Sequence, residues 1–345
     1  MKSRDLLSLR IDELSNIMEE FDEKSFRAVQ IFQWIHQKNV DQIDEMMNLP
    51  KDLREKLKRN FEWNKLKLEQ KAVSNIDKTT KYLFALKDNN IIESVLMHYT
   101  YGNTACISSQ VGCRMGCAFC ASTLDGLIRN LTAGEMLEQI YQIQKDSNEK
   151  VSNIVIMGSG EPLDNLDNIL LFIELINHPK GQNIGQRHIT LSTCGLVDKM
   201  YELASKKLQI TLAVSLHAPN DTIREKMMPI AKKYSIEEIL EACHHYIEMT
   251  NRRITFEYAL IDHVNDRIEH ARELGERLKG MLCHVNLIPM NPVKESSLKE
   301  STSSSVKDFQ DTLQSYGIQT TVRRKLGSDI DAACGQLRRR YLEKK

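Results

Sequence analysis

The segment Cys106–Cys120, CISSQVGCRMGCAFC, holds four of the eight cysteines in this 345-residue chain. Three of them, Cys113, Cys117 and Cys120, follow the spacing C-x3-C-x2-C. Thiolates this close together can share one soft metal centre: zinc, copper or an iron–sulfur cluster. A structural zinc site usually takes its remaining ligands from a second spaced pair, and the chain has no other spaced cysteine pair. Three ligands therefore favour a [4Fe–4S] cluster whose fourth iron stays open to a small molecule.

With the aromatic residue Phe119 before its last cysteine, this segment resembles the radical S-adenosylmethionine family. The resemblance implies that the open iron binds the amino and carboxylate groups of S-adenosylmethionine. It also implies that one electron from the cluster cleaves the sulfonium and gives a 5′-deoxyadenosyl radical. From the residues alone, the cysteines could instead be three buried structural thiols, or a disulfide with a spare thiol.

Shorter motifs follow downstream, and together they are far more specific than any one alone. They are MGSGEPL at Met157–Leu163, LST at Leu191–Thr193, VSLH at Val214–His217, HVNLIP at His284–Pro289 and DIDAACGQL at Asp329–Leu337. With Cys106–Cys113, they resemble the adenine carbon-2 RNA methyltransferases of the same superfamily, and the resemblance extends more weakly into the N-terminal region. It implies methylation of carbon 2 of an adenine in 23S ribosomal RNA, at the peptidyl transferase centre. Adenine 37 of transfer RNA is a second candidate substrate.

The composition is that of an ordinary globular protein, with 41% hydrophobic and 27% charged residues. No apolar run has the length of a membrane span, and Met1–Arg4 leads into an amphipathic segment rather than a signal sequence. Eight cysteines in a chain of this length fit a reducing compartment better than a disulfide framework. We therefore expect a cytoplasmic monomer without a membrane partner.

The formal net charge of zero argues against nonspecific binding of polyanions. Local basic clusters can still contact RNA phosphates. Such clusters occur at residues 54–59, 252–253, 323–325 and 338–340. The last two lie close in sequence to the DIDAACGQL motif, so we expect RNA contacts there.

Three regions follow one another along the chain. Apolar residues at helical spacing predict a small helical accessory domain over residues 1–62. Strand-like runs at 79–87 and 91–96 flank an Asp-Asn-Asn turn and predict a β-hairpin. We expect this hairpin, within a bridge at residues 63–98, to connect the accessory domain to a core domain at residues 99–345.

Strands and helices alternate in the core domain. The predicted strands are 103–107, 152–157, 188–193, 209–216, 253–260 and 283–289. The predicted helices between them are 132–145, 164–177, 197–206, 235–250 and 266–279. This alternation is typical of parallel βα units in an α/β protein. Six units predict an open, partial (β/α)6 barrel, with a mouth wide enough for RNA. The resemblance implies that this barrel is of the radical S-adenosylmethionine type.

Functional residues of βα barrels gather at the carboxyl ends of the strands, and the motifs obey that rule. The resemblance implies that S-adenosylmethionine is held by Gly160, Glu161, Ser192, Ser215, Leu216, His217 and Asn291. The glycine-rich turn would let the backbone approach the methionine amine. Taken singly, each residue has an ordinary alternative: a tight turn, a strand-end cap or a structural histidine.

The resemblance also assigns three catalytic residues. Cys334 would be methylated by one S-adenosylmethionine, and a radical formed on that methyl group would add to the electron-poor carbon 2 of adenine. Cys106 would then attack the sulfur of Cys334 and release the product by forming a disulfide. Glu93 would accept the proton from carbon 2. From the residues alone, Cys334 could be a buried free thiol and Glu93 an exposed strand carboxylate.

Cys194, Cys243 and Cys283 match no catalytic position, and we expect them to be packing residues. The chemistry implies two further partners, a flavodoxin-like electron donor and a disulfide reductant. Two alternative functions stay open at this point. One is methylation of carbon 8 of the same ribosomal adenine, which confers antibiotic resistance, although Val111 and Pro162 resemble the carbon-2 branch of the family more closely. The other is a non-catalytic, zinc-binding RNA module.

Overall fold

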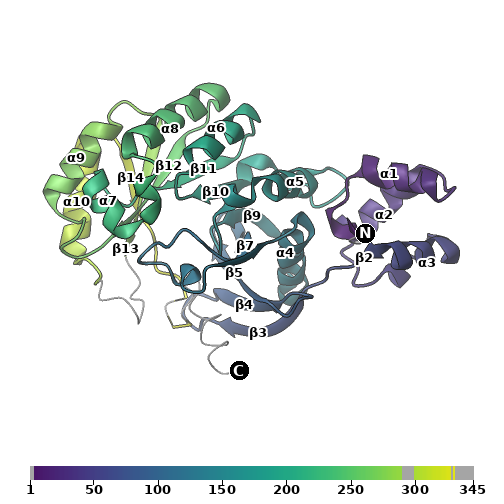
Figure 1. Ribbon diagram of the computed structural model, residues 1–345. Coiled ribbons are helices and arrows are strands. Elements are labelled where there is room, and N and C mark those ends of the chain that lie inside the picture. Colours follow the sequence, from purple (N-terminus) through teal and green to yellow (C-terminus); the bar gives the residue numbers. More distant parts are fainter. Residues whose placement is uncertain (1–3, 290–298, 328, 331–345) are drawn as a thin grey trace.

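The computed structural model describes residues 4–289, 299–327 and 329–330. Its centre is a ten-stranded mixed sheet with the order β14-β13-β12-β11-β10-β9-β6-β5-β4-β3 (Figure 1). Within the described residues, the strands from β6 to β14 in this order all run parallel to their neighbours. They are β6 (Gly102–Cys106), β9 (Val151–Ile156), β10 (Ile189–Thr193), β11 (Thr211–Ser215), β12 (Ile254–Leu260), β13 (Cys283–Pro289) and β14 (Gln319–Val322). The six predicted strands are confirmed, and β14 extends them at one edge.

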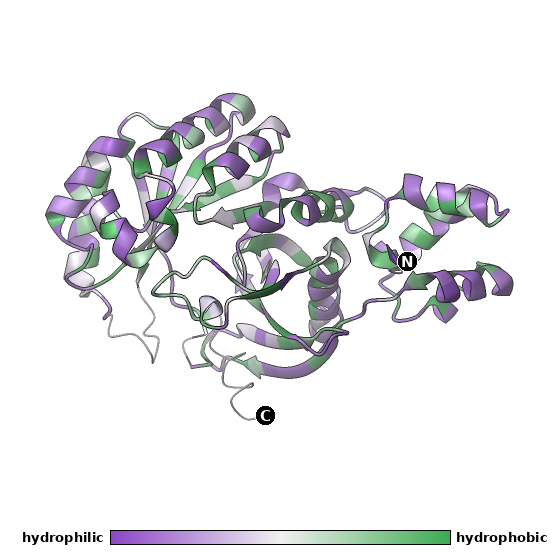
Figure 2. Ribbon diagram, viewed as in Figure 1, coloured by the Kyte–Doolittle hydropathy of each residue, from purple (hydrophilic) through white to green (hydrophobic). Residues whose placement is uncertain are grey.

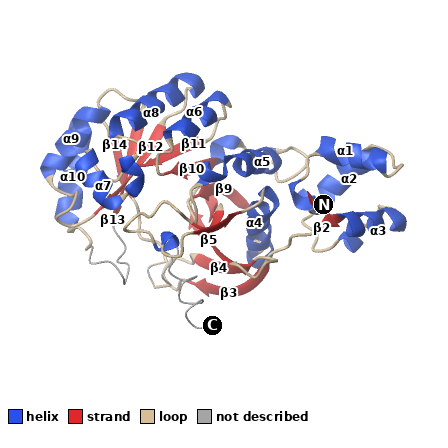
Figure 3. Ribbon diagram, viewed as in Figure 1, coloured by secondary structure: helices blue, strands red, loops and turns tan. Residues whose placement is uncertain are grey.

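Helices connect the parallel strands and cover one face of the sheet (Figure 3). They are α4 (Ala133–Ser147), α5 (Leu166–Asn177), α6 (Val197–Ser205), α7 (Asp221–Met227), α8 (Ile236–Thr250), α9 (Ile268–Leu278) and α10 (Ser303–Ser315). The predicted helices are present, whereas the short α7 was not predicted. Capping boxes start two of them, Thr132 with Glu135 in α4 and Ser235 with Glu238 in α8. The predicted α/β partial barrel is thereby confirmed.

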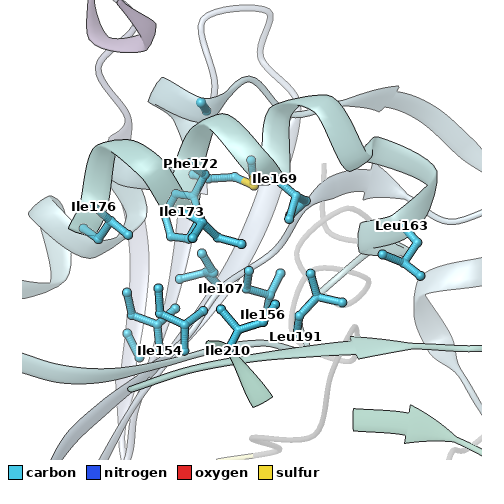
Figure 4. Packing of buried hydrophobic residues seen from close by; sticks show 14 of the residues in the cluster. Ile107, Ile154, Ile156, Leu163, Ile169, Phe172, Ile173, Ile176, Leu191 and Ile210 are labelled. Carbon is cyan, nitrogen blue, oxygen red and sulfur yellow. The ribbon is translucent and has the colours of Figure 1, made fainter. Parts of the chain in front are cut away.

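The packing of α5 shows why these helices form where they do. Ile169, Phe172, Ile173 and Ile176 recur at a spacing of three and four residues, which places them on one face of the helix. Figure 4 shows this face directed at buried side chains of the sheet, such as Ile156 of β9. Burial of a large aliphatic or aromatic side chain stabilises the fold by about 1.5–3 kcal/mol. This apolar contact fixes the strand ends that lie beside the site.

Antiparallel strands continue the sheet beyond β6. They are β3 (Lys67–Val73), β4 (Thr80–Ala85) and β5 (Ile91–Tyr99). The predicted hairpin is confirmed as β4 and β5, and β5 in turn pairs with β6. The bridge region is therefore part of the same sheet as the barrel strands. A separate two-stranded sheet, β7 (Gln110–Gly112) with β8 (Leu127–Asn130), frames the cysteine segment.

The N-terminal helices extend to one side of the sheet (Figure 1). They are α1 (Ile11–Glu20), α2 (Phe26–His36) and α3 (Lys51–Asn60), and the short β1 (Arg4–Asp5) pairs with β2 (Phe61–Glu62). Figure 2 shows hydrophobic and hydrophilic residues alternating along these helices, as expected for amphipathic segments. The domain limits at residues 62 and 98 stay predictions. Among the described residues, no helix is both long enough and apolar enough to cross a membrane.

Candidate active site

A cavity of about 360 Å³ lies among the carboxyl ends of the parallel strands. Its wall includes residues that end or directly follow four neighbouring strands: Cys106, Met157, Thr193 and Ser215. Parallel strands end at the same edge of a sheet, so residues from distant parts of the chain meet there. The motifs singled out in the sequence therefore face one cavity.

Three thiols line this cavity, those of Cys113, Cys117 and Cys120. The loop that carries them is anchored by backbone hydrogen bonds of 2.9 Å, from Cys113 N to Gly126 O and from Ala118 N to Met227 O. Burial raises the pKa of the Cys113 and Cys117 thiols to about 12. Both therefore keep their protons at neutral pH until a positive centre binds and displaces them.

This donor set fits an iron–sulfur cluster better than a single ion. Within the described ranges, no group of three His, Cys, Asp or Glu side chains is placed to hold one metal ion. A structural zinc site needs four ligands converging on one point. A [4Fe–4S] cluster binds each thiolate through a different iron, so its ligands surround a larger body. Three cysteines around one cavity meet that requirement.

The glycine-rich turn after β9 packs directly on the connection between β6 and β7. A Cβ on Gly158 would lie 2.7 Å from the carbonyl carbon of Ile107, and one on Gly160 would lie 2.6 Å from Cβ of Gln110. Gly160 also has a φ of +110°, which side chains rarely tolerate. The glycines are therefore required by close packing between two loops, which also leaves the turn's backbone open to the cavity.

Glu161 holds the neighbouring loop in place. One carboxylate oxygen accepts from Leu163 N at 3.0 Å and the other from Cys194 N at 2.7 Å. Burial raises the pKa of this carboxyl group, while the two backbone donors stabilise its charged form. The carboxylate thus links the turn after β9 to the loop after β10. That role was not predicted from the sequence.

The ends of β10 and β11 supply the next part of the wall. Ser192 Oγ and Ser215 Oγ lie 3.5 Å apart and both face the cavity. Leu216 is buried beside them and does not line the cavity. His217 lines it, accepts at Nδ1 from Ala259 N at 2.9 Å, and has a pKa lowered to about 3 by burial. The imidazole is therefore neutral.

His217 also contacts the cysteine loop. Its ring meets that of Phe119 edge to face, with ring centroids 4.8 Å apart. Phe119 was noted in the sequence for its place before the last cysteine. The contact shows that this aromatic residue ties the cysteine loop to the end of β11.

Cys106 ends β6 and lines the cavity. Its side chain packs in a small apolar cluster that includes Val95, Met97, Met157 and Leu326. Such surroundings restrict the access of water and leave the thiol facing the cavity.

Glu93 is buried, so the alternative interpretation of this residue as an exposed strand carboxylate is wrong. The carboxylate forms an ion pair of 3.3 Å with Lys81, whose side chain is fully buried. Glu93 does not itself line the cavity, but Val95 does. Side chains two residues apart lie on the same face of a strand, so Glu93 shares the face that borders the cavity. Asn291 and Cys334 lie outside the described residues.

Two functional candidates were missed by sequence reasoning. Glu257 of β12 is buried, lines the cavity and accepts from Asn286 Nδ2 at 2.9 Å. Arg224 is fully buried and donates to the backbone oxygens of Cys194 at 2.7 Å and Leu216 at 3.2 Å. A charged residue inside an apolar strand could have revealed Glu257. Nothing in the sequence distinguished Arg224 from a solvent-exposed helical residue.

The remaining cysteines differ in their surroundings. Cys243 and Cys283 are buried in the main core, in accord with the prediction that they pack. Cys194 is buried too, but it lines the same cavity as Cys117, and burial raises the pKa of its thiol. The cavity wall therefore holds a further thiol beyond the three cluster candidates and Cys106.

Basic and aromatic side chains lie near the edge of the cavity. Arg323, Arg324 and Lys325 line it and are exposed. The rings of Tyr99 and Tyr101 stack with centroids 4.9 Å apart, and Tyr101 is 70% exposed. Stacked aromatics beside guanidinium groups are typical of surfaces that bind single-stranded nucleic acid. The basic cluster at 338–340 falls outside the described residues.

Known proteins resemble this chain along nearly its whole length. Residues 107–275 match the radical SAM superfamily, and residues 4–62 match the ribosomal RNA large subunit methyltransferase N-terminal domain. A probable dual-specificity RNA methyltransferase RlmN from Clostridium novyi is 56% identical over 98% of this chain and 99% of its own length. Its namesake from Alkaliphilus oremlandii is 58% identical over 99% of this chain and 100% of its own length.

A solved structure agrees with the sequence relatives. The crystal structure of a radical SAM methyltransferase from Sphaerobacter thermophilus superposes with a TM-score of 0.92 at 41% identity, and the match covers 96% of this chain and 98% of that one. A non-catalytic zinc module is therefore ruled out as a description of this chain. The chain belongs to the RlmN family of dual-specificity RNA methyltransferases within the radical SAM superfamily.

Proposed function

We propose that the protein methylates carbon 2 of an adenine in 23S ribosomal RNA, at the peptidyl transferase centre, and of adenine 37 in transfer RNA. The observation that carries this proposal is the shared cavity. It brings the thiols of Cys113, Cys117 and Cys120 together with the thiol of Cys106 at the strand ends. The proposed reaction combines radical formation at a cluster with disulfide formation by a thiol. It therefore needs the cluster cysteines and the resolving cysteine in one cavity. The RNA substrates place the reaction in the cytoplasm.

Two groups would bind in this cavity. Cys113, Cys117 and Cys120 would hold a [4Fe–4S] cluster, and the position of all three in one cavity wall supports this assignment. The turn at Gly160 and the strand ends at Ser192 and Ser215–His217 would hold S-adenosylmethionine, with Glu161, Leu216 and Asn291 completing the contacts. When bound, these groups supply the methyl carbon and the one-electron chemistry that activates it. The serine hydroxyls that line the cavity would orient the adenosyl part.

The chain's own cysteines would carry and release the methylene carbon. Cys334 would hold it as a thioether to carbon 2 of the adenine. The Cys106 thiolate would then attack the sulfur of Cys334, so that an S–S bond forms as the C–S bond breaks. The electron pair of the broken bond would take up a proton and leave a methyl group. The position of Cys106 in the cavity wall supports this role, because its thiol lies in the same cavity as the three cluster candidates.

Glu93 would accept the proton from carbon 2. Its burial beside Lys81 supports a fixed position for the carboxylate. Each cycle would end with a Cys106–Cys334 disulfide, so turnover would require a disulfide reductant. A flavodoxin-like protein would deliver the single electrons, and the enzyme would act as a monomer.

The test is an anaerobic reaction of the reconstituted protein with ribosomal RNA fragments, S-adenosylmethionine and a reductant. Digestion to nucleosides and mass spectrometry should reveal 2-methyladenosine. Cys334→Ala protein, which lacks the methyl carrier, provides the matched control and should give no product. The appearance of 8-methyladenosine instead would move the enzyme to the carbon-8 activity, and methylation by Cys334→Ala would refute the cysteine relay.

A further inference from the structure

The turn between β3 and β4, residues 74–79, binds the segment that follows β14. Asp77 Oδ2 accepts from Gly327 N at 2.8 Å. In the opposite direction, Asn75 N donates to Asp329 Oδ2 at 2.9 Å. The turn and the segment thus each contribute one carboxylate and one backbone N–H, although more than 240 residues of sequence separate them. Hydrogen bonds with a charged acceptor are stronger than neutral ones.

Hydrogen bonds within the turn fix its shape without help from the bound segment. Asp77 Oδ1 accepts from Thr79 N at 2.9 Å, and Ser74 N donates to Thr79 O at 2.8 Å. Ser74 Oγ accepts from Ile76 N at 3.1 Å. These bonds hold the turn closed and leave the second oxygen of Asp77 pointing to Gly327.

The bound segment passes the thiol of Cys106 just before it reaches the turn. Leu326 packs in the same apolar cluster as Cys106 and Met97, and it also lines the cavity. Next to it, Lys325 forms an ion pair of 2.5 Å with Glu300. The segment is therefore held at three successive points, and the turn is the last of them within the described part of the chain.

We propose that the turn of residues 74–79, through Asp77, is a docking site that holds the chain at Gly327 and Asp329 and thereby keeps Cys334 within reach of Cys106. Asp77 is a positioning residue in this scheme, since it acts through the segment and not on the substrate. The inference rests on the proposed roles of Cys106 and Cys334. Both the turn and the segment lie outside the region that matches the superfamily. The proposal therefore gives a further part of the chain a role in catalysis.

Chain length gives the size of the effect. From Asp329, about five residues lead to Cys334, which limits its reach to roughly 17 Å. From Leu326 the free tether would be about eight residues, and from the end of β14 about twelve. The effective concentration of one tethered group near another falls roughly as the −3/2 power of tether length. Loss of docking should therefore lower the effective concentration of the two thiols about two- to fourfold.

The experiment compares Asp77→Ala with Asp88→Ala in the full-length, cluster-loaded protein. Asp88 is a matched control, because its Oδ1 closes the turn between β4 and β5 by accepting from Asn90 N, yet it does not contact the Gly327 segment. The Cys106–Cys334 disulfide is equilibrated anaerobically with glutathione and quantified by alkylation and mass spectrometry. We expect Asp77→Ala to lower the disulfide equilibrium constant two- to fourfold and Asp88→Ala to leave it unchanged.

Amide hydrogen exchange at Gly327 provides a second readout. The N–H that Asp77 holds should exchange about tenfold faster in Asp77→Ala than in Asp88→Ala, with thermal unfolding of the two variants compared alongside. If wild-type protein forms no Cys106–Cys334 disulfide, the proposed function is wrong. If wild type forms it and Asp77→Ala forms it with the same equilibrium constant, the docking inference is overturned.

Discussion

The buried pair of Lys81 and Glu93 allows a sharp test of whether Glu93 is a catalytic base or a structural residue. Lys81→Met removes the positive partner and leaves the carboxylate in a dry environment, with the Lys81 side chain fully buried and that of Glu93 5% exposed. Loss of one partner of a buried pair costs about 3–5 kcal/mol of unfolding free energy. We therefore expect a marked fall in the midpoint of urea unfolding for Lys81→Met.

The double variant Lys81→Met with Glu93→Gln separates the two roles. Neutralising the remaining carboxylate should restore at least half of the lost stability, because replacement of both members of a buried pair is often close to neutral. Formation of the methylated RNA product should nevertheless stay absent, since the proton acceptor is gone. Product formation is measured in a single-turnover reaction. Recovery of both stability and methylation would show that Glu93 only balances Lys81, and would refute its role as the base.

Three further predictions follow from the described contacts. Cys106→Ala should stall with RNA covalently bound to Cys334, a thioether that survives reductant on a denaturing gel; normal turnover would contradict the resolving role. Tyr101→Ala should weaken RNA binding by about 1–3 kcal/mol, measured by filter binding, if a base stacks on its exposed ring. Burial raises the pKa of Asp5 to about 6, so the folded state retains a proton that the unfolded state releases, and stability falls as pH rises from about 4 to 6. Asp5→Asn should remove that slope and stabilise the protein by up to about 3 kcal/mol at pH 7, as seen in urea unfolding at several pH values.

Local patterns predicted those parts of the fold that depend on short-range chemistry. The spacing of Cys113, Cys117 and Cys120 identified one wall of the cavity, and the alternation of strands and helices predicted the parallel sheet. The rule that sites gather at strand ends then predicted that Ser192 and Ser215 line the same cavity. Each of these inferences needs only neighbours in sequence and one general property of βα folds.

Other features depend on contacts that no local pattern reveals. Arg224 reads as a surface residue, yet it is buried where it donates to two loop carbonyls. Glu161 was expected at the cofactor, but its carboxylate also accepts two backbone N–H groups, one of them 33 residues away. The meeting of Asp77 with Gly327 spans 250 residues. Such pairings follow from how the sheet curves and where its added strands lie, which spacing and periodicity do not encode.

The added strands show how a common barrel can acquire a specialised reaction. The region that matches the superfamily, residues 107–275, contains the three candidate cluster cysteines and the glycine turn. Three residues lie before it: Glu93 on β5, Lys81 on β4 and Asp77 in the turn preceding β4. Because β5 pairs with β6, these residues are fixed to the barrel edge that ends at Cys106. The shared barrel would thus generate the reactive carbon. The antiparallel extension would position Glu93, the proton acceptor, and the cysteine segment that delivers this carbon to adenine.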